Sequence, residues 1–227
     1  MQQNQNNSII QKPLSELIAD QLKWKIWHES IQFGERLLET DLAESFDVSR
    51  STIREALKIL ESEELVVSQA RKGTYVADFT DQDADEMIEL RALIEAHAFS
   101  QSIRHLDHKD VKKLEDIVAE MKVKAEEEDW NALFDLDMQF HSYVVGLCGN
   151  SRIIKIYDSL QVQIRTFLMH LDKYYSSPQS FYAEHKQLLE ALVSKNAHTV
   201  NRRVKEHIAY VETKLLGQQS DKELKEV

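Results

Sequence analysis

Hydrophobic and polar positions take up helical spacing close to the start of the chain. The first ten residues, MQQNQNNSII, are polar, uncharged and aperiodic, and we expect a disordered arm there. From Lys12 onward apolar side chains recur three and four positions apart, and Pro13 suits the first turn of a helix. The pattern predicts a helix that runs to about Ser30, before Gly34 interrupts it. Its expected inward side chains are Leu14, Leu17, Ile18, Leu22 and Ile26.

Two more helical stretches follow, separated by a tight turn. The first runs from Thr40 to about Phe46, with Thr40 as its expected N-cap. After a turn at residues 47–48, Ser49 opens a helix that runs to about Glu64. Its expected inward side chains are Ile53, Leu57 and Leu60.

A small β-hairpin is predicted directly after the third helix. The runs ELVVSQ and TYVADF are rich in β-branched and aromatic residues, and the turn sequence ARKG separates them. Three helices closed by such a hairpin form the winged variant of the helix-turn-helix. We therefore assign residues 11–78 to a winged helix-turn-helix DNA-binding domain.

The remainder of the chain is helical in pattern. The acidic stretch DFTDQDAD, residues 78–85, is expected to be a linker, and the charged tail from Gln218 is expected to fray. Short connections make neighbouring helices antiparallel, so residues 83–217 are expected to form a helical bundle. The fold class is thus mostly α, a winged helix-turn-helix followed by an all-helical antiparallel bundle. The predicted bundle helices span about residues 83–105, 108–128, 129–148, 150–174, 178–195 and 197–217.

Composition narrows the class of protein. Of 227 residues, 42% are hydrophobic, which suffices for real cores, while five glycines and two prolines favour helices. A single cysteine, Cys148, leaves no internal disulfide framework, and a cytoplasmic location fits best. No segment approaches the roughly 18 uninterrupted apolar residues of a membrane span, so we expect no membrane partner.

The net charge of −11 argues at first against a nucleic-acid partner, because DNA is itself a polyanion. Basic residues nevertheless cluster on the third helix and in the hairpin turn. The N-terminal end of a recognition helix faces base edges and phosphates, and the hairpin turn is then the tip of the wing. The candidate DNA-contacting residues are Arg50, Ser51, Thr52, Arg54, Arg71, Lys72 and Gly73.

Four polar residues interrupt the apolar faces of three bundle helices. Asp137 and His141 are four positions apart and therefore adjacent on one helix face, while His185 and His207 lie on the apolar stripes of later helices. Burying an unpaired carboxylate is costly, and a cation would neutralise it. One carboxylate and three imidazoles suit a divalent transition metal, with zinc first and nickel, manganese or iron as alternatives.

A metal held by four protein ligands keeps one or two coordination positions for a small organic acid. Arg91 shares an apolar stripe with Met87, Ile94 and Ala98. An inward arginine near a metal needs an anion, so Arg91 either clamps the carboxylate of an effector or pairs with Glu95. Two further acids, Glu184 and Glu206, each precede a histidine and are expected at the solvated surface rather than against the imidazoles.

The N-terminal sequence resembles a known DNA-binding domain. The run GERLLETDLAESFDVSRSTIREALKILESEELV, followed by ARKGTYV, is similar to the winged helix-turn-helix of the GntR family of bacterial transcription factors. The resemblance implies that Arg50 and Arg54 contact operator DNA and that the turn from Arg71 to Gly73 reaches the minor groove. Two positions depart from the family, because Asp47 and Glu64 stand where glycine is usual.

Residues 83–217 resemble the all-helical FadR-type ligand-binding domain called FCD. Metal-binding members carry a D-x-x-x-H helix, a later histidine often preceded by glutamate, and a final histidine. The resemblance implies ligand roles for Asp137, His141, His185 and His207. It also implies a metabolite-responsive regulator, a repressor, that binds a pseudo-palindromic operator in double-stranded DNA as a homodimer. The implied effectors are carbon-source acids such as sugar acids, lactate or citrate-like molecules.

The sequence is compatible with two alternatives. In the first, the metal activates water and the protein is a metal-dependent hydrolase, although the sequence has no HExxH pattern and no evident nucleophile. In the second, the protein is a regulator whose metal is purely structural.

Overall fold

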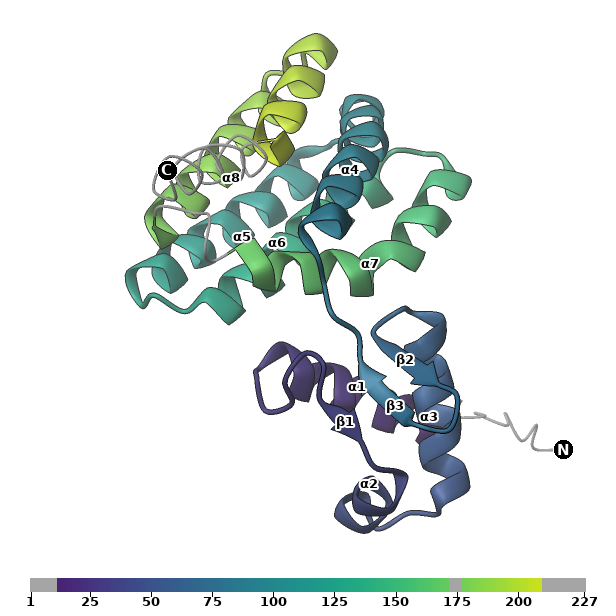
Figure 1. Ribbon diagram of the computed structural model, residues 1–227. Helices are drawn as coiled ribbons and strands as arrows, with labels where there is room; N and C mark the ends of the chain where they lie inside the picture. Colours follow the sequence, from purple (N-terminus) through teal and green to yellow (C-terminus); the bar gives the residue numbers. More distant parts are fainter. Residues whose placement is uncertain (1–11, 172–176, 210–227) are drawn as a thin grey trace, which may run out of the picture. The chain divides into compact units, whose positions relative to one another are not determined.

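The computed structural model describes residues 12–171 and 177–209, and the chain divides into two compact units, one ending at Asp78 and one beginning at Phe79 (Figure 1). The expected N-terminal arm, the end of the last predicted helix and the C-terminal tail lie outside the described residues. Within those residues no helix is long and apolar enough to span a membrane.

The N-terminal unit is a three-helix domain closed by a small antiparallel sheet. Its strands are β1 (Arg36–Leu37), β2 (Val66–Gln69) and β3 (Gly73–Val76), in the order β1-β3-β2. Sequence analysis missed β1. This strand pairs Arg36 with Tyr75 of β3. The elements are α1 (Leu14–Trp27), β1 (Arg36–Leu37), α2 (Glu39–Phe46), α3 (Arg50–Ser62), β2 (Val66–Gln69) and β3 (Gly73–Val76).

The core of this domain forms where α1 packs against α3. The inward faces of these helices are buried as expected, at Ile18, Leu22, Ile26, Ile53, Leu57 and Leu60. Leu14 and Leu17 were expected to point inward as well, and this is wrong, since they are 54% and 46% exposed. The buried face of α1 begins only at Ile18.

The turn between α2 and α3 is built by two neighbouring residues. Asp47 takes the left-handed conformation, with φ of 52°, which glycine usually supplies and aspartate tolerates better than most residues. Ser49 is the N-cap of α3, and its hydroxyl accepts a hydrogen bond from the backbone N–H of Thr52. The N-cap of α2 is Leu38 rather than Thr40, whose hydroxyl donates to Asp41 instead.

The C-terminal unit is the expected helical bundle. The helix α6 packs against α4, α5, α7 and α8 and so lies at its centre. The expected linker is shorter than predicted, because residues 81–85 already belong to α4, which Thr80 opens with a capping box to Asp83. The helices are α4 (Asp81–Ser102), α5 (His108–Glu126), α6 (Trp130–Gly146), α7 (Ser151–Leu171), α8 (Pro178–Val193) and a last segment at residues 197–209 (Figure 1).

Candidate functional site

Asp137, His141, His185 and His207 meet in the interior of the bundle. Asp137 and His141 come from α6, His185 from α8, and His207 from the helical segment at residues 197–209. One ligand atom of each lies within 4.8 Å of those of the other three. All four residues are at most 3% exposed. Sequence analysis therefore selected four residues that the fold brings to one point.

Apolar packing holds these side chains in place. His185 packs against the ring of Phe181, one turn earlier on α8, and against the edge of Phe140 from α6. The rings of His141 and His207 stack with their centroids 5.2 Å apart. Because the surroundings exclude water, the polar atoms of the cluster depend on one another for partners.

The hydrogen bonds of His185 fix its tautomer. Its Nδ1 lies 2.9 Å from the backbone carbonyl oxygen of Phe181, and a carbonyl only accepts, so Nδ1 carries a hydrogen. In a neutral ring Nε2 then has only a lone pair, and it faces Oδ1 of Asp137 at 2.9 Å. Two acceptors are thus held together inside the protein. A proton or a cation between them would remove the conflict.

A second imidazole is oriented in the same way. Nδ1 of His141 contacts Oε2 of Glu95 on α4, which leaves Nε2 of His141 buried without a hydrogen-bond partner. The Oδ2 atom of Asp137 is likewise buried and accepts no hydrogen bond, although Nη2 of Arg91 lies 3.8 Å from it. Buried polar atoms of native proteins nearly always have partners, so the chemistry of these two atoms fits a cation at this position. Imidazoles whose far nitrogen binds a carboxylate or a carbonyl are typical of metal sites.

The charges of the cluster do not balance. Arg91 donates from Nε to Oε1 of Glu95 at 2.6 Å, and its Nη2 lies 3.8 Å from Oδ2 of Asp137. With these three groups ionised, one positive charge faces two negative ones. Burial would raise the pKa of Glu95, but Arg91 and His141 hold it at about 2. Burial also opposes ionisation of Asp137, but the imidazoles of His141 and His185 in their protonated forms, together with the guanidinium of Arg91, keep its pKa well below the ordinary value.

The imidazole of His207 is neutral at physiological pH. Burial is the main cause that lowers its pKa, to about 3, although Glu184 acts in the opposite direction. The Oε2 atom of Glu184 lies 3.7 Å from Nδ1 of His207, and the side chain is only 15% exposed. The expectation that Glu184 is solvated was therefore wrong. Glu206 is 49% exposed and pairs with arginines of its own helix.

Arg91 pairs with Glu95, which is the second of the two roles foreseen for it, and its contact with an effector stays a prediction. Its Nη2 atom nevertheless remains buried without a hydrogen bond. The hydroxyl of Tyr157 on α7 is also buried and unpaired. Sequence analysis missed Glu95 as the partner of His141, although its position four residues after Arg91 placed both on one face of α4.

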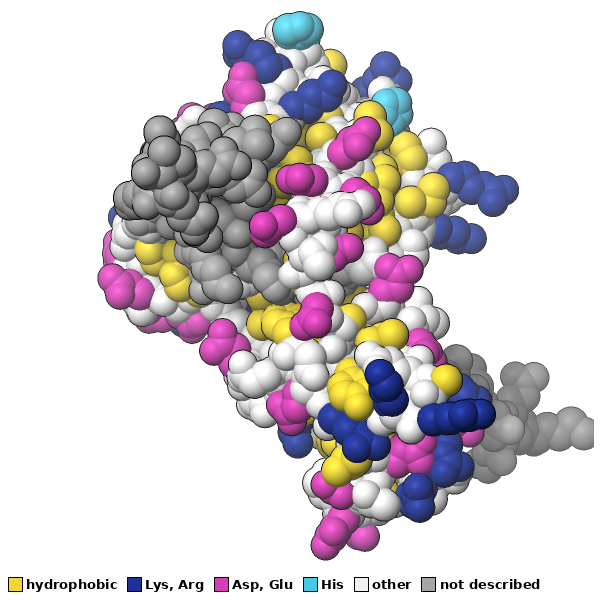
Figure 2. All heavy atoms as spheres, viewed as in Figure 1, with side chains coloured by type: hydrophobic (Ala, Val, Ile, Leu, Met, Phe, Trp, Pro, Cys, Tyr) yellow, Lys and Arg dark blue, Asp and Glu magenta, His cyan; other side chains and the backbone are white. Residues whose placement is uncertain are grey.

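The basic candidates of the N-terminal domain lie on its surface. Figure 2 shows Lys and Arg side chains gathered on one part of this domain, with acidic side chains between them. Thr52 is half-buried and the other six candidates are exposed, namely Arg50, Ser51, Arg54, Arg71, Lys72 and Gly73. The wing turn has positive φ at Arg71 (63°) and Gly73 (111°).

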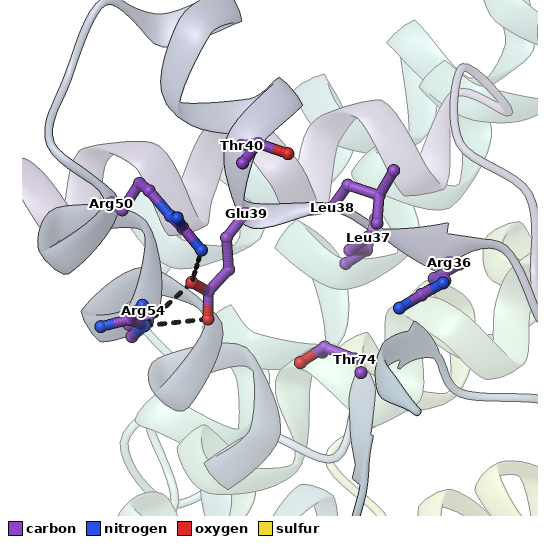
Figure 3. Close-up of a pocket in the computed structure, with 9 residues that line it drawn as sticks. Arg36, Leu37, Leu38, Glu39, Thr40, Arg50, Arg54 and Thr74 are labelled. Atoms are coloured by element: carbon purple, nitrogen blue, oxygen red, sulfur yellow. Dashed lines mark hydrogen bonds and ion pairs between the residues drawn. The ribbon is translucent and has the colours of Figure 1, made fainter. Parts of the chain in front are cut away.

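A hollow of about 390 Å³ connects the recognition helix α3 with the wing (Figure 3). Arg50 and Arg54 line it from α3, Gly73 and Thr74 from β3, and Arg36 from β1. A Cβ atom on Gly73 would come within 3.1 Å of Nε of Arg36, so glycine lets this guanidinium pass over the wing strand. Arginines of α3 and β1 therefore lie around the same hollow as the wing strand β3, and together they form one basic surface.

Comparison with known families decides the class of the protein. Residues 14–76 match the bacterial regulatory proteins of the gntR family, and residues 86–210 match the FCD domain. The chain belongs to the GntR family. It is a transcriptional regulator of the GntR/FCD type rather than an enzyme, and the alternative of a metal-dependent hydrolase is wrong.

Individual relatives agree with this family. The gluconate operon transcriptional repressor of Bacillus subtilis (strain 168) is 29% identical over 184 residues, or 79% of this chain and 75% of that protein. E. coli McbR/YncC has a similar structure, with a TM-score of 0.76 at 20% identity over 92% of this chain and 100% of that one. A GntR transcriptional regulator from Rhodococcus sp. RHA1 gives a TM-score of 0.75 at 24% identity, covering 89% and 97%. At these identities the two solved structures support the fold alone.

Proposed function

We propose that this regulator is a metabolite-responsive repressor of the FadR type that binds a pseudo-palindromic operator as a homodimer. Its bundle holds a divalent transition metal through Asp137, His141, His185 and His207, and the metal takes the carboxylate of a small organic acid. Effector binding lowers operator affinity through a coupling free energy of about 1–3 kcal/mol.

The observation that carries the metal proposal is the contact between His185 and Asp137. A lone pair on Nε2 and a carboxylate oxygen lie 2.9 Å apart in a dry interior, and a neighbouring imidazole nitrogen, Nε2 of His141, is unpaired. A divalent ion would accept all of these lone pairs. The donor set of three nitrogens and one oxygen suits zinc first, then nickel, manganese or iron. When bound, the ion supplies a Lewis-acidic centre for a carboxylate.

The charge of the cluster favours an anionic effector. Ionised Arg91, Glu95 and Asp137 leave one net negative charge, which a divalent ion changes to one net positive charge. A monocarboxylate would then neutralise the site. Nη2 of Arg91 is buried and makes no hydrogen bond, and it lies 3.8 Å from Oδ2 of Asp137, so it is the protein donor that we assign to the effector. The repressor of a gluconate operon among the relatives favours a sugar acid as the first effector to test.

The DNA-binding proposal assigns operator contacts to the exposed end of α3 and to the wing. Arg50 and Arg54 read base edges or phosphates, with help from the hydroxyls of Ser51 and Thr52. The wing turn, Arg71 to Gly73, reaches the minor groove. One small winged domain offers few contacts for specific affinity, and two-fold pairing doubles them, which is the physical argument for a homodimer.

Gel-shift assays test the DNA contacts. The probe is a duplex that the wild-type protein selects from fragmented genomic DNA. We expect Arg50→Ala and Arg54→Ala to abolish the shift, while Lys112→Ala, an exposed lysine of α5, leaves it unchanged. Sedimentation analysis should show a dimer for all three variants. Unchanged shifts for both arginine variants would disprove the assigned contacts.

Thermal-shift assays test the effector site. Gluconate, lactate and citrate are added to protein that is loaded with zinc or stripped by a chelator. We expect at least one acid to raise the Tm of the loaded protein and to lose this effect after chelation. If the acid binds equally well after chelation while the Tm of the free protein falls, the metal is purely structural.

A further inference from the structure

A carboxylate lies between the two arginines of α3 to which operator contacts are assigned. Glu39 is the first residue of α2, and its oxygens accept hydrogen bonds from Nε of Arg54 at 2.9 and 3.0 Å (Figure 3). The Nη2 atom of Arg50 lies 3.4 Å from Oε2 of the same carboxylate. The side chain of Glu39 is 29% exposed, against 57% for Arg50 and 55% for Arg54. An acidic group is thus built into the basic surface.

The terminal amino groups of Arg54 remain available to contact DNA. Both hydrogen bonds to Glu39 use Nε of Arg54, so neither terminal amino group is needed for the pair. A guanidinium reads guanine through two of its N–H groups in a fixed fork. An exposed arginine samples many rotamers, and a contact at Nε restricts them before DNA arrives. Glu39 therefore orients Arg54 in advance.

The negative charge of Glu39 lowers the affinity of the domain for DNA of any sequence. Affinity without sequence preference comes from phosphates neutralised by Lys and Arg. A carboxylate in the hollow that Arg36, Arg50 and Arg54 line reduces the attraction for every phosphate nearby. DNA that offers the correct base gains from the oriented arginine, whereas other DNA experiences only the weakened attraction.

We propose that Glu39 is a specificity-determining residue, which orients Arg54 toward one base pair of each half-site and suppresses binding to unrelated DNA. The inference rests on the operator contacts proposed for Arg50 and Arg54. It assigns Glu39 to positioning and does not require that its carboxylate touch a base.

The test uses full-length protein and a pool of duplexes with a randomised core, from which the wild type selects its site. Affinities are then measured for this site, for its single-base variants and for an unrelated duplex. The variants are Glu39→Ala, Glu39→Gln and the control Asp41→Ala, which removes an acid from the same first turn of α2. Equal Tm values and dimerisation establish that all variants are folded.

Glu39→Ala is expected to lower discrimination at one base pair of each half-site by roughly fivefold or more. Its affinity for the unrelated duplex is expected to rise by about two- to fivefold, because a like charge is removed. The amide oxygen of Glu39→Gln still accepts from Arg54, so this variant should keep the discrimination and gain only the non-specific affinity. Asp41→Ala should keep the discrimination. Equal loss of affinity for all sequences in Glu39→Ala, or unchanged discrimination, would overturn the proposal.

Variants of Arg54 separate this inference from the function on which it rests. Affinities of the Arg54 variants are measured by titration at low salt, where phosphate contacts still hold a variant whose gel shift is lost. If Glu39 acts through Arg54, Arg54→Ala loses discrimination at the same base pair, and adding Glu39→Ala causes no further loss there. If Arg54→Ala leaves discrimination intact, the proposed operator contact is itself wrong. If Arg54→Ala loses discrimination and Glu39→Ala does not, only the role of Glu39 is refuted.

Discussion

The contact between Asp137 and His185 predicts a substitution whose effect on stability changes sign with metal. Asn has the shape of Asp but offers an amide N–H, which can donate to the Nε2 lone pair of His185 at the observed 2.9 Å. In metal-free protein Asp137→Asn therefore replaces a contact between two acceptors with a hydrogen bond. It also removes the negative charge that Arg91 leaves unbalanced in the cluster.

The expected magnitudes follow from burial, since Asp137 is 1% exposed. Relief of an unsatisfied buried polar contact is worth about 1–3 kcal/mol, so the metal-free variant should gain that free energy of unfolding. Each kcal/mol corresponds to about 2–4 °C in Tm for a chain of this size. Metal at about a thousand times its Kd stabilises the wild type by about 4 kcal/mol, and the variant should lose most of this gain.

The assay is thermal unfolding near pH 8, above the ordinary imidazole pKa of about 6.5, with either a chelator or zinc present. The Tm of the variant should be higher than that of the wild type in chelator and lower than that of the wild type in zinc. Competition with a chromophoric chelator should show a loss of metal affinity of about 100-fold or more, since even partners of ligands contribute about 10–100-fold. Asp116→Asn is the control, because Asp116 forms an exposed pair with Lys112 on α5 and should change little.

One result would refute the reasoning. If Asp137→Asn is destabilised equally in chelator and in zinc, the aspartate is a structural partner of a protonated His185. The cluster would then be a buried ion-pair network and no metal site.

Three further predictions concern local structure. Ser49→Ala removes the acceptor of the hydrogen bond from the backbone N–H of Thr52, and should lower the free energy of unfolding of the N-terminal domain by about 0.5–2 kcal/mol in thermal unfolding. An unchanged Tm would contradict the role of Ser49 as N-cap. Asp47→Val places a β-branched residue at φ of 52° and should cost about 1–2 kcal/mol, whereas Asp47→Gly should cost nothing by the same measurement. Tyr143 donates to Asp110 at 2.7 Å, which raises the pKa of its hydroxyl from 10.0 to about 12. The stabilisation by this hydrogen bond is complete below pH 10 and is lost as pH rises through about 12. The difference between the absorbance titrations of the wild type and of Tyr143→Phe should therefore show a hydroxyl with a pKa near 12 rather than near 10.

Much of the cluster of Asp137 and the three histidines was predictable, because these polar residues stand on the apolar faces of their helices. Asp137 and His141 stand on an apolar face, and such a conflict between pattern and polarity is visible in a single sequence. Their common destination was harder to derive, because residues on three helices converge only if the topology brings those helices together. The helical pattern and the resemblance to the FCD domain supplied that topology.

Other features had no signal in the sequence. Helical spacing places Glu95 beside Arg91, but it does not reveal that α6 presents His141 to the other oxygen of the same carboxylate. The strand at Arg36 and Leu37 is two residues long, too short for an alternating pattern. Leu14 is exposed because the buried face of α1 begins only at Ile18. Each of these depends on which element packs against which.

The most direct measurement is an anomalous-scattering crystal structure of protein purified without chelator, combined with metal analysis of the same sample. The account predicts one ion per chain, bound by Asp137, His141, His185 and His207. Metal-free protein that retains these side chains in mutual hydrogen bonds, and that binds its effector unchanged after metal removal, would contradict it.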